Sequence, residues 1–132
     1  MVIANYTEKE IVDMLKVSAK SLVNTNNKPG IVHVSGLKYT ISKDGMLRSA
    51  SFVDKDGKET PIDINNPRSD KNYRTGLTDY YAQGHDGFTM LKKYDQAEKI
   101  FDFDICKCIE DYFVKHPEPV EIKDDGRIKV VD

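Results

Sequence analysis

Residues 79–88 are the part of the sequence whose side chains are hardest to explain as scaffold alone. Two tyrosines, of which Tyr80 is the first, stand side by side at the expected end of a strand, so one ring should reach the core and the other solvent. Gly84 and Gly87 flank Asp86, and glycines allow a sharp backbone turn that presents this carboxylate to a ligand. An aromatic ring can stack on a base, and a nearby carboxylate can accept hydrogen bonds from ribose hydroxyls. The residues alone leave two interpretations open, a ligand site and a turn with ordinary packing.

No other group of residues has the spacing of a catalytic or metal site. The histidines His33, His85 and His116 lie in separate segments, without a second ligand at helical or hairpin spacing. Asp-Lys-Asp-Gly at 54–57 resembles the middle of a calcium loop, but Phe52 falls at the first ligand position, so we expect a hairpin turn. The sequence also lacks a nucleophile elbow and a glycine-rich phosphate loop. The chain by itself is therefore not expected to be catalytic.

Composition and charge exclude several classes of partner. The chain has 132 residues, a common size for a single domain, so one domain over residues 1–132 is expected. Twenty basic residues against 22 acidic ones give a formal charge of -2, which removes the attraction that dominates nucleic-acid binding. Its apolar runs are far shorter than the roughly 20 residues of a membrane span, and its first residues do not form a signal peptide. We expect no nucleic-acid partner and no membrane span.

Hydrophobic periodicity and turn residues predict the elements that position residues 79–88. A helix is expected from Thr7 to Leu22, because Thr7 and Glu10 have the spacing of a capping box and apolar residues recur on one face. A polar stretch at 24–30 predicts a loop. Alternating apolar residues and Asp-Gly turns predict six strands, at 2–5, 31–41, 46–53, 60–64, 73–81 and 127–131. Helices that bracket such strands are typical of an α+β fold with a mixed β-sheet and packed helices.

A second helix is expected near the C-terminus, with Asp102 or Asp104 as its N-cap and His116 at its end. Its inner face, which should be buried, consists of side chains at helical spacing: Ile105, Cys108, Ile109, Tyr112 and Phe113. Cys106 and Cys108 are two residues apart and point to different faces, so a mutual disulfide is not expected. We expect both thiols to be reduced and at least one to be buried.

Four motifs occur in a recognisable order along the chain. They are Val-Ser-Gly-Leu-Lys-Tyr at 34–39, Asn-Tyr-Arg at 72–74, the segment 79–88, and Gly-Arg-Ile-Lys at 126–129. Together they resemble the C-terminal domain of the 5'-nucleotidase and 2',3'-cyclic-nucleotide 2'-phosphodiesterase family. The helix expected at 7–22 also matches a helix of that domain, so the resemblance runs nearly from end to end.

The resemblance implies roles for five residues. In that family this domain binds the nucleoside part of a nucleotide, while a separate N-terminal metallophosphoesterase domain holds two divalent metal ions and hydrolyses the phosphoester. Tyr80 matches one of two aromatic rings that sandwich the base, and Asp86 matches the carboxylate that contacts the nucleoside. Gly84 and Gly87 match the glycines around this carboxylate. His85 replaces a family glycine and places a bulky side chain beside the site.

Other parts of the family's site have no counterpart in the sequence. The second ring, and an asparagine and arginine segment, lie in the family upstream of the stretch that matches Met1, so we expect half a nucleoside site and no cofactor in this chain. The resemblance implies the substrate-binding domain of a bacterial hydrolase of nucleotide catabolism, located in the periplasm, at the cell wall or outside the cell. A UDP-sugar or other nucleotide-diphosphate hydrolase is a second interpretation. The alternative of another class is a non-catalytic interaction or packing module with a degenerate nucleoside site.

Overall fold

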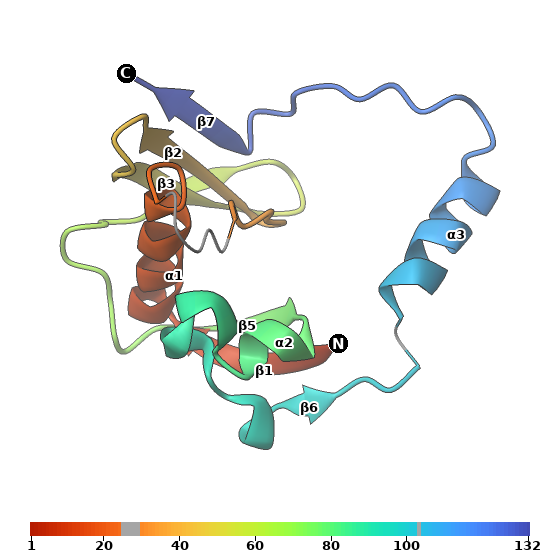
Figure 1. The fold of residues 1–132 in the computed structure, drawn as a ribbon, viewed down its shortest axis with the longest axis horizontal. Coiled ribbons are helices and arrows are strands. Elements are labelled where there is room, and N and C mark those ends of the chain that lie inside the picture. The colour runs from red at the N-terminus through yellow and green to blue at the C-terminus, as the bar shows by residue number, and fades with distance from the viewer. Residues whose placement is uncertain (25–29, 103) are drawn as a thin grey trace.

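A computed structural model describes residues 1–24, 30–102 and 104–132 of the protein. The loop predicted at 24–30 lies, apart from its two end residues, outside this description. The helices and strands are β1 (Val2–Thr7), α1 (Glu8–Lys20), β2 (Leu37–Ser42), β3 (Leu47–Val53), β4 (Glu59–Pro61), β5 (Asn72–Leu77), α2 (Asp79–Ala82), β6 (Glu98–Lys99), α3 (Ile105–Lys115) and β7 (Ile128–Val131) (Figure 1). Three short 3-10 turns, η1 (His85–Gly87), η2 (Thr89–Leu91) and η3 (Tyr94–Gln96), lie between α2 and β6.

The strands form two sheets. One has the order β4-β3-β2-β7, in which β3 is antiparallel to both β4 and β2, and β7 is parallel to β2. The other has the order β5-β1-β6 and is antiparallel throughout. α1 runs from the three-stranded sheet toward the four-stranded one (Figure 1). The fold is therefore α+β with a mixed sheet, as predicted.

The first helix begins where the sequence predicts. The Thr7 side chain accepts a hydrogen bond from the backbone N–H of Glu10 at 3.1 Å, and the Glu10 carboxylate accepts one from the Thr7 N–H at 2.7 Å. This capping box satisfies N–H groups that have no partner within the helix. The apolar face of α1 is buried at Ile11, Val12, Leu15 and Ala19. It shares one core cluster with buried residues of β2 and β3, namely Tyr39, Ile41, Leu47 and Ala50.

The strand predicted at 31–41 is shorter in the structure. Only its second half is β2, because the backbone of the first half bonds to side chains instead of to a neighbouring strand. The N–H of Val32 donates to Ser18 Oγ at 2.9 Å, and Tyr39 Oη donates to the Val32 carbonyl at 2.8 Å. The backbone N–H and carbonyl of Val32 thus have partners without a neighbouring strand.

Aspartate side chains define two of the turns. The Asp54 carboxylate accepts a hydrogen bond from the Asp56 N–H at 2.9 Å, which is the hairpin turn expected there instead of a calcium loop. The strand predicted at 60–64 is the shorter β4. Its pattern is interrupted because Asp63 accepts from the Asn65 N–H at 3.1 Å and begins a turn.

The strand predicted at 73–81 is wrong in its second half. β5 ends at Leu77, and α2 then begins with Thr78 as its N-cap, whose side chain accepts from the Tyr81 N–H at 3.5 Å. A threonine is a strong helix N-cap, and this local preference outweighs an alternating pattern that spans only a few residues. The two tyrosines therefore lie on a helical turn and not at a strand end.

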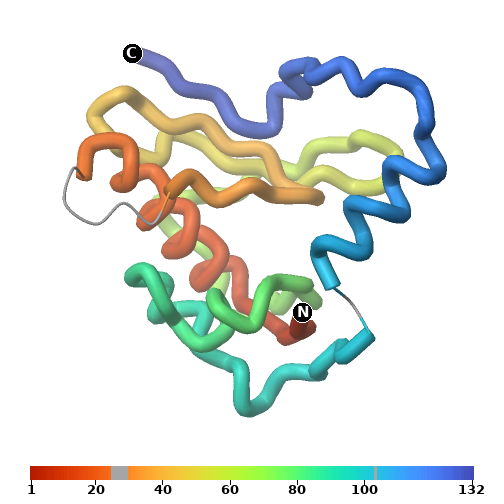
Figure 2. The backbone as a smooth tube through the Cα atoms, turned by 45° about the vertical axis from the view of Figure 1, so that its right-hand side comes forward, coloured from red at the N-terminus to blue at the C-terminus, as the bar shows by residue number. Residues whose placement is uncertain are grey.

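The second predicted helix is α3, and its N-cap is Asp104, which accepts from the Cys106 N–H at 2.9 Å. The expected burial of its inner face is wrong, since four of its side chains are about half exposed: Ile105 53%, Ile109 52%, Tyr112 51% and Phe113 53%. The reason is that α3 stands apart from both sheets (Figures 1 and 2). Cys106 is exposed and Cys108 partly exposed, so the expected buried thiol is also wrong, while both thiols are free, as predicted. Among the described residues, no helix has the length and apolar character needed to cross a membrane.

Candidate functional site

The segment singled out from the sequence forms one compact turn in the structure. α2 ends at its C-cap, Gln83, and Gly84 then adopts φ 82°, a left-handed conformation that only glycine adopts readily. A Cβ at Gly84 would also come within 3.2 Å of Lys92 Cβ. Asp86 has φ 55°, which aspartate tolerates better than most residues, and Gly87 has φ 79°. The backbone therefore reverses twice within a few residues and brings the two ends of the segment together.

Two aromatic rings anchor this turn to the core. Phe88 is fully buried, and the Tyr81 ring meets it edge-on with centroids 5.1 Å apart. The carbonyl of Ala82, which is also buried, accepts a hydrogen bond from the Lys93 N–H at 3.0 Å. Tyr80 points the other way and is 49% exposed. The predicted division between a packed ring and an exposed ring is thus present, although a helical turn produces it.

Tyr80 and Asp86 lie in direct contact. Tyr80 Oη donates a hydrogen bond to Asp86 Oδ1 at 3.0 Å. This bond to the carboxylate raises the pKa of the Tyr80 hydroxyl above its usual value, because ionisation would remove the donor and place two negative charges side by side. The structure therefore brings together the two residues that the resemblance assigned to nucleoside binding.

His85 covers part of this pair. Its ring stacks on that of Tyr80, with centroids 4.6 Å apart and planes 27° apart. His85 Nε2 lies 3.1 Å from Gln83 Oε1, in hydrogen-bonding distance. Sequence reasoning identified His85 as a departure from the family but did not identify Gln83 as its hydrogen-bond partner. The available signal was the position of Gln83, two residues before His85 in the same turn. Gln83 orients the imidazole, and one face of the Tyr80 ring is occupied.

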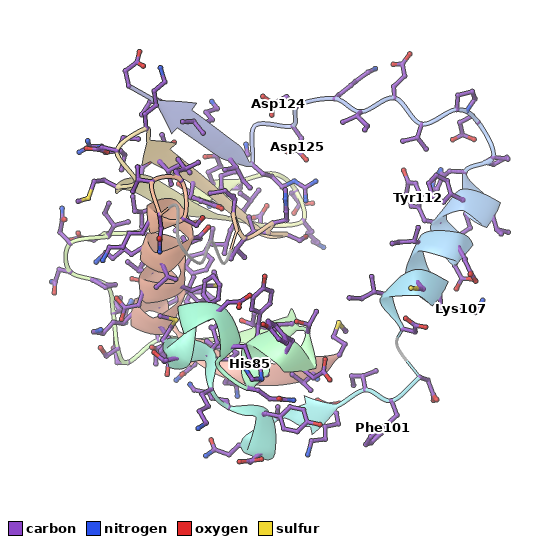
Figure 3. All side chains as sticks on the ribbon, in the orientation of Figure 1. His85, Phe101, Lys107, Tyr112, Asp124 and Asp125 are labelled. Atoms are coloured by element: carbon purple, nitrogen blue, oxygen red, sulfur yellow. The ribbon has the colours of Figure 1, made fainter. Side chains whose placement is uncertain are left out.

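The motif at 126–129 does not contribute to this turn. It comprises the last two residues before β7 and the first two of that strand, and Figure 3 shows Asp124 and Asp125 just before it, far from His85. Arg127 donates to the carbonyl of Val34 at 2.9 Å, so it fastens the start of β7 to the segment before β2. In the described structure it therefore links the C-terminal strand to the segment that precedes β2.

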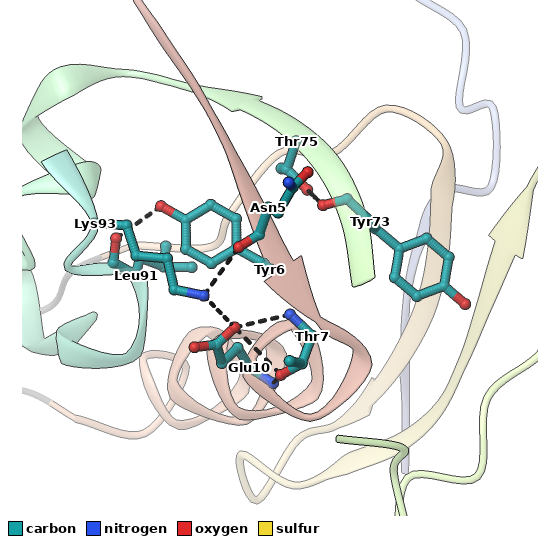
Figure 4. Close-up of polar contacts among 8 residues, drawn as sticks. All are labelled: Asn5, Tyr6, Thr7, Glu10, Tyr73, Thr75, Leu91 and Lys93. Carbon is teal, nitrogen blue, oxygen red and sulfur yellow. Dashed lines mark hydrogen bonds and ion pairs between the residues drawn. The ribbon is translucent and has the colours of Figure 1, made fainter. Parts of the chain in front are cut away.

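A partly buried polar network holds the stretch after the turn against β1 and α1 (Figure 4). Tyr6 Oη donates to the Leu91 carbonyl at 2.7 Å, and burial together with the nearby Glu10 carboxylate raises the pKa of Tyr6 to about 12. Lys93 Nζ pairs with the Glu10 carboxylate at 2.7 Å and donates to the Asn5 carbonyl at 2.9 Å. Partial burial opposes ionisation of Glu10, but hydrogen bonds from Lys93 and Thr7 outweigh it and lower the pKa of Glu10. The network joins β1 and α1 to the stretch after η2.

An apolar cavity of about 560 Å³ lies between the two sheets, and sequence reasoning did not find it. Phe52 of β3 and Tyr73 of β5 stack in its wall with centroids 3.9 Å apart. Tyr81 lines the cavity, whereas Tyr80 and Asp86 do not. The alternation of Tyr73 and Leu77 along β5 was the available signal for one wall, but a sequence does not show that two sheets leave a space between them.

Two solved structures resemble this one over 99% of its length. A 5'-nucleotidase precursor from Thermus thermophilus is 26% identical with a TM-score of 0.74, and the match covers 25% of that chain. The NAD nucleotidase of Haemophilus influenzae is 17% identical with a TM-score of 0.68, and the match covers 24% of that chain. No family model and no curated protein matches the sequence. The protein has the fold of a 5'-nucleotidase C-terminal domain, as its motifs indicated, and spans about a quarter of these relatives.

Proposed function

We propose that the chain is a nucleoside-binding domain of a 5'-nucleotidase or cyclic-nucleotide phosphodiesterase type hydrolase. The observation that carries the proposal is the contact between Tyr80 and Asp86, the two residues that the motif resemblance matches to the family's ring and carboxylate. Tyr80 is 49% exposed, whereas Phe88 in the same turn is fully buried and Tyr81 packs against it. The likeness to the Thermus thermophilus 5'-nucleotidase precursor supports the same assignment.

The chemistry of the pair suits a nucleoside. The Tyr80 ring stacks on the base, and such a contact contributes about 0.5–1.5 kcal/mol beyond burial. The Asp86 carboxylate has several lone pairs, so it can accept from a ribose hydroxyl while it still accepts from Tyr80, and a hydrogen bond to a charged group contributes about 1.5–3 kcal/mol. Because association costs several kcal/mol, we expect a dissociation constant of about 1 mM or weaker for this half-site.

Hydrolysis belongs to another part of the parent enzyme in this proposal. Among the described residues, no group of three His, Cys, Asp or Glu side chains is placed to hold an ion. We assign the two divalent metal ions to a separate metallophosphoesterase domain, and substrate orientation to this chain. Because the Thermus thermophilus relative is described as a precursor, we also propose that the parent enzyme is exported. Because that relative is a 5'-nucleotidase, we propose that the parent enzyme acts in nucleotide catabolism.

A second function is favoured by one observation. The stack between His85 and Tyr80 fills one face of the ring that should receive the base. If the free face is not sufficient for binding, the chain is a non-catalytic interaction module that keeps the fold and has lost the ligand. The experiment below separates the two functions.

The experiment is an NMR titration of the ¹⁵N-labelled chain with adenosine and AMP. We expect amide shifts that cluster at Tyr80, Gly84, Asp86 and Gly87, and that disappear in Tyr80→Ala. Tyr112→Ala is the matched control, because Tyr112 is 51% exposed on α3 and lies outside the turn, so this variant should titrate like the wild type. Shifts elsewhere, or none at saturating nucleoside, would refute nucleoside binding and leave the interaction module.

A further inference from the structure

The imidazole of His85 lies where a planar ligand of Tyr80 would lie. Its plane is within 27° of the Tyr80 ring plane, and the two ring centroids are 4.6 Å apart, which is the geometry of a stacked aromatic pair. A nucleobase is also a planar aromatic group, and it stacks on an aromatic side chain through the same kind of contact. The imidazole and a base therefore compete for this face of Tyr80.

The face that His85 covers adjoins the turn that carries Asp86. His85 and Asp86 are consecutive residues of η1, so their Cα atoms are about 3.8 Å apart. Asp86 Oδ1 accepts the hydrogen bond from Tyr80 Oη at 3.0 Å, at the edge of the same ring. A base in the place of the imidazole would stack on Tyr80 with its ribose beside the Asp86 carboxylate. We therefore take the covered face, and not the opposite one, as the base position of the proposed nucleoside site.

The side chain of His85 can leave this face, because the contacts that hold it lie in solvent. His85 and Gln83 are both exposed, and Tyr80 is 49% exposed. Water replaces a hydrogen bond at an exposed position, so the contact of His85 Nε2 with Gln83 Oε1, at 3.1 Å, adds little net stability. Exposed side chains change rotamer within picoseconds to nanoseconds. The stacked and the unstacked conformer of His85 therefore exchange rapidly.

The rest of the turn does not depend on where the imidazole lies. The His85 carbonyl accepts a hydrogen bond from the Phe88 N–H at 3.0 Å, and Phe88 is fully buried. The hydrogen bond between Tyr80 and Asp86 involves neither the imidazole nor Gln83. Rotation of the His85 side chain therefore moves its ring and keeps the residues that would hold a nucleoside in place.

We infer that His85 is an internal competitor that closes the base position on Tyr80, and that Gln83 holds it closed. The inference rests on the proposed function and assigns control of affinity to a residue of the site itself. A ligand binds only the conformer from which the imidazole has left, so the apparent dissociation constant is the intrinsic one divided by the open fraction. With about one chain in ten open, binding is about tenfold weaker than without the imidazole. Because the imidazole leaves before any base enters, this factor is the same for every base.

The test measures binding of AMP and UMP, which differ in their bases, by NMR titration of the complete ¹⁵N-labelled chain. His85→Ala removes the competing ring, and Gln83→Ala removes the hydrogen bond that holds it. His116→Ala is the matched control, because His116 also packs on a tyrosine, Tyr112, with centroids 4.5 Å apart, but at the end of α3 and outside the turn. We expect His85→Ala to bind both nucleotides about tenfold more tightly than the wild type, Gln83→Ala about threefold more tightly, and His116→Ala equally.

A second measurement follows the imidazole directly. Nuclear Overhauser effects between the ring protons of His85 and Tyr80 should be present in the wild type without nucleotide, because the rings are stacked there. They should disappear at saturating AMP, where the base takes the place of the imidazole.

Three results would overturn the inference and leave the proposed function standing. Binding by His85→Ala that is no tighter than binding by the wild type, or a contact between His85 and Tyr80 that persists with AMP bound, would mean that the base uses the opposite face. An increase that differs between AMP and UMP would mean that His85 contacts the base instead of competing with it. Binding of AMP by neither the wild type nor His85→Ala would refute the proposed function, and the inference with it.

Discussion

Replacement of Tyr6 by phenylalanine tests the network that holds the candidate site against the core. Tyr6 is fully buried, and its hydroxyl donates to the Leu91 carbonyl at 2.7 Å. Tyr6→Phe removes the donor and leaves a buried carbonyl without its partner, while the ring keeps its packing. Such a loss costs about 1–3 kcal/mol of unfolding free energy. We therefore expect the variant to fold and to unfold at lower urea concentration than the wild type at neutral pH.

The same variant makes a specific prediction about pH. The pKa of Tyr6 is raised from 10.0 to about 12 in the folded protein, so between these values the folded state keeps a proton that the unfolded state loses. The stabilisation that the Tyr6 hydroxyl contributes is fully present below pH 10, and it is lost as the pH rises toward and through the pKa of the folded state. By about pH 11 the loss is about 1.4 kcal/mol, one tenfold change in the unfolding equilibrium.

The measurement is urea unfolding of wild type and Tyr6→Phe at about pH 8 and about pH 11. Between these conditions the wild type should lose about 1.4 kcal/mol more than the variant, since the variant has no hydroxyl to titrate. Tyr112→Phe, which changes a tyrosine 51% exposed on α3, should follow the wild type. Equal losses in wild type and Tyr6→Phe would refute the assignment of a buried, proton-retaining hydroxyl.

Four further predictions follow from other features of the chain. Gly84→Ala should lower the unfolding free energy more than Gly57→Ala, as measured by chemical denaturation. Both substitutions cost about 1–2 kcal/mol because both glycines have a left-handed φ, but only at Gly84 would the new Cβ crowd a neighbour. Thr7→Ala should lower stability by about 0.5–2 kcal/mol by removing the cap of α1, and Thr7→Ser should restore most of it. Cys106 and Cys108 should both react with a thiol reagent in native buffer, Cys106 faster, and a thiol that reacts only in denaturant would contradict this. The chain alone should not hydrolyse AMP, 2',3'-cyclic AMP or a chromogenic phosphodiester with added manganese, zinc or cobalt, and activity that survives repurification and scales with protein would contradict this.

The parts of the fold that the sequence predicted correctly depend on local signals. The capping box of Thr7 and Glu10 set the start of α1, and Asp54 set a hairpin turn through its own side chain. These interactions join residues only a few positions apart, so a short stretch of sequence contains both partners of each hydrogen bond. The strand predicted through residue 81 was wrong because Thr78 is a helix cap, a signal that was present but that the alternating pattern obscured.

Features that depend on distant packing could not be predicted in this way. The helical spacing of the apolar side chains on α3 was predicted correctly. Whether that face is buried depends on which element covers it, and no local signal carries that information. The family resemblance assigned Tyr80 and Asp86 to one site, whereas their hydrogen bond, the Gln83–His85 contact and the cavity behind Phe52 came only from the structure. Periodicity identifies the face that an element should bury, and tertiary structure determines whether a partner is there.

The central claim is that the Tyr80 ring receives a nucleobase beside Asp86. The most direct measurement is the intermolecular nuclear Overhauser effect between the H2 and H8 protons of adenosine and the ring protons of Tyr80, in the ¹³C-labelled chain. We predict contacts from both adenine protons to the Tyr80 ring, and contacts from the ribose protons to residues 84–87. Contacts absent at saturating adenosine, or found only at rings outside residues 79–88, would contradict the claim.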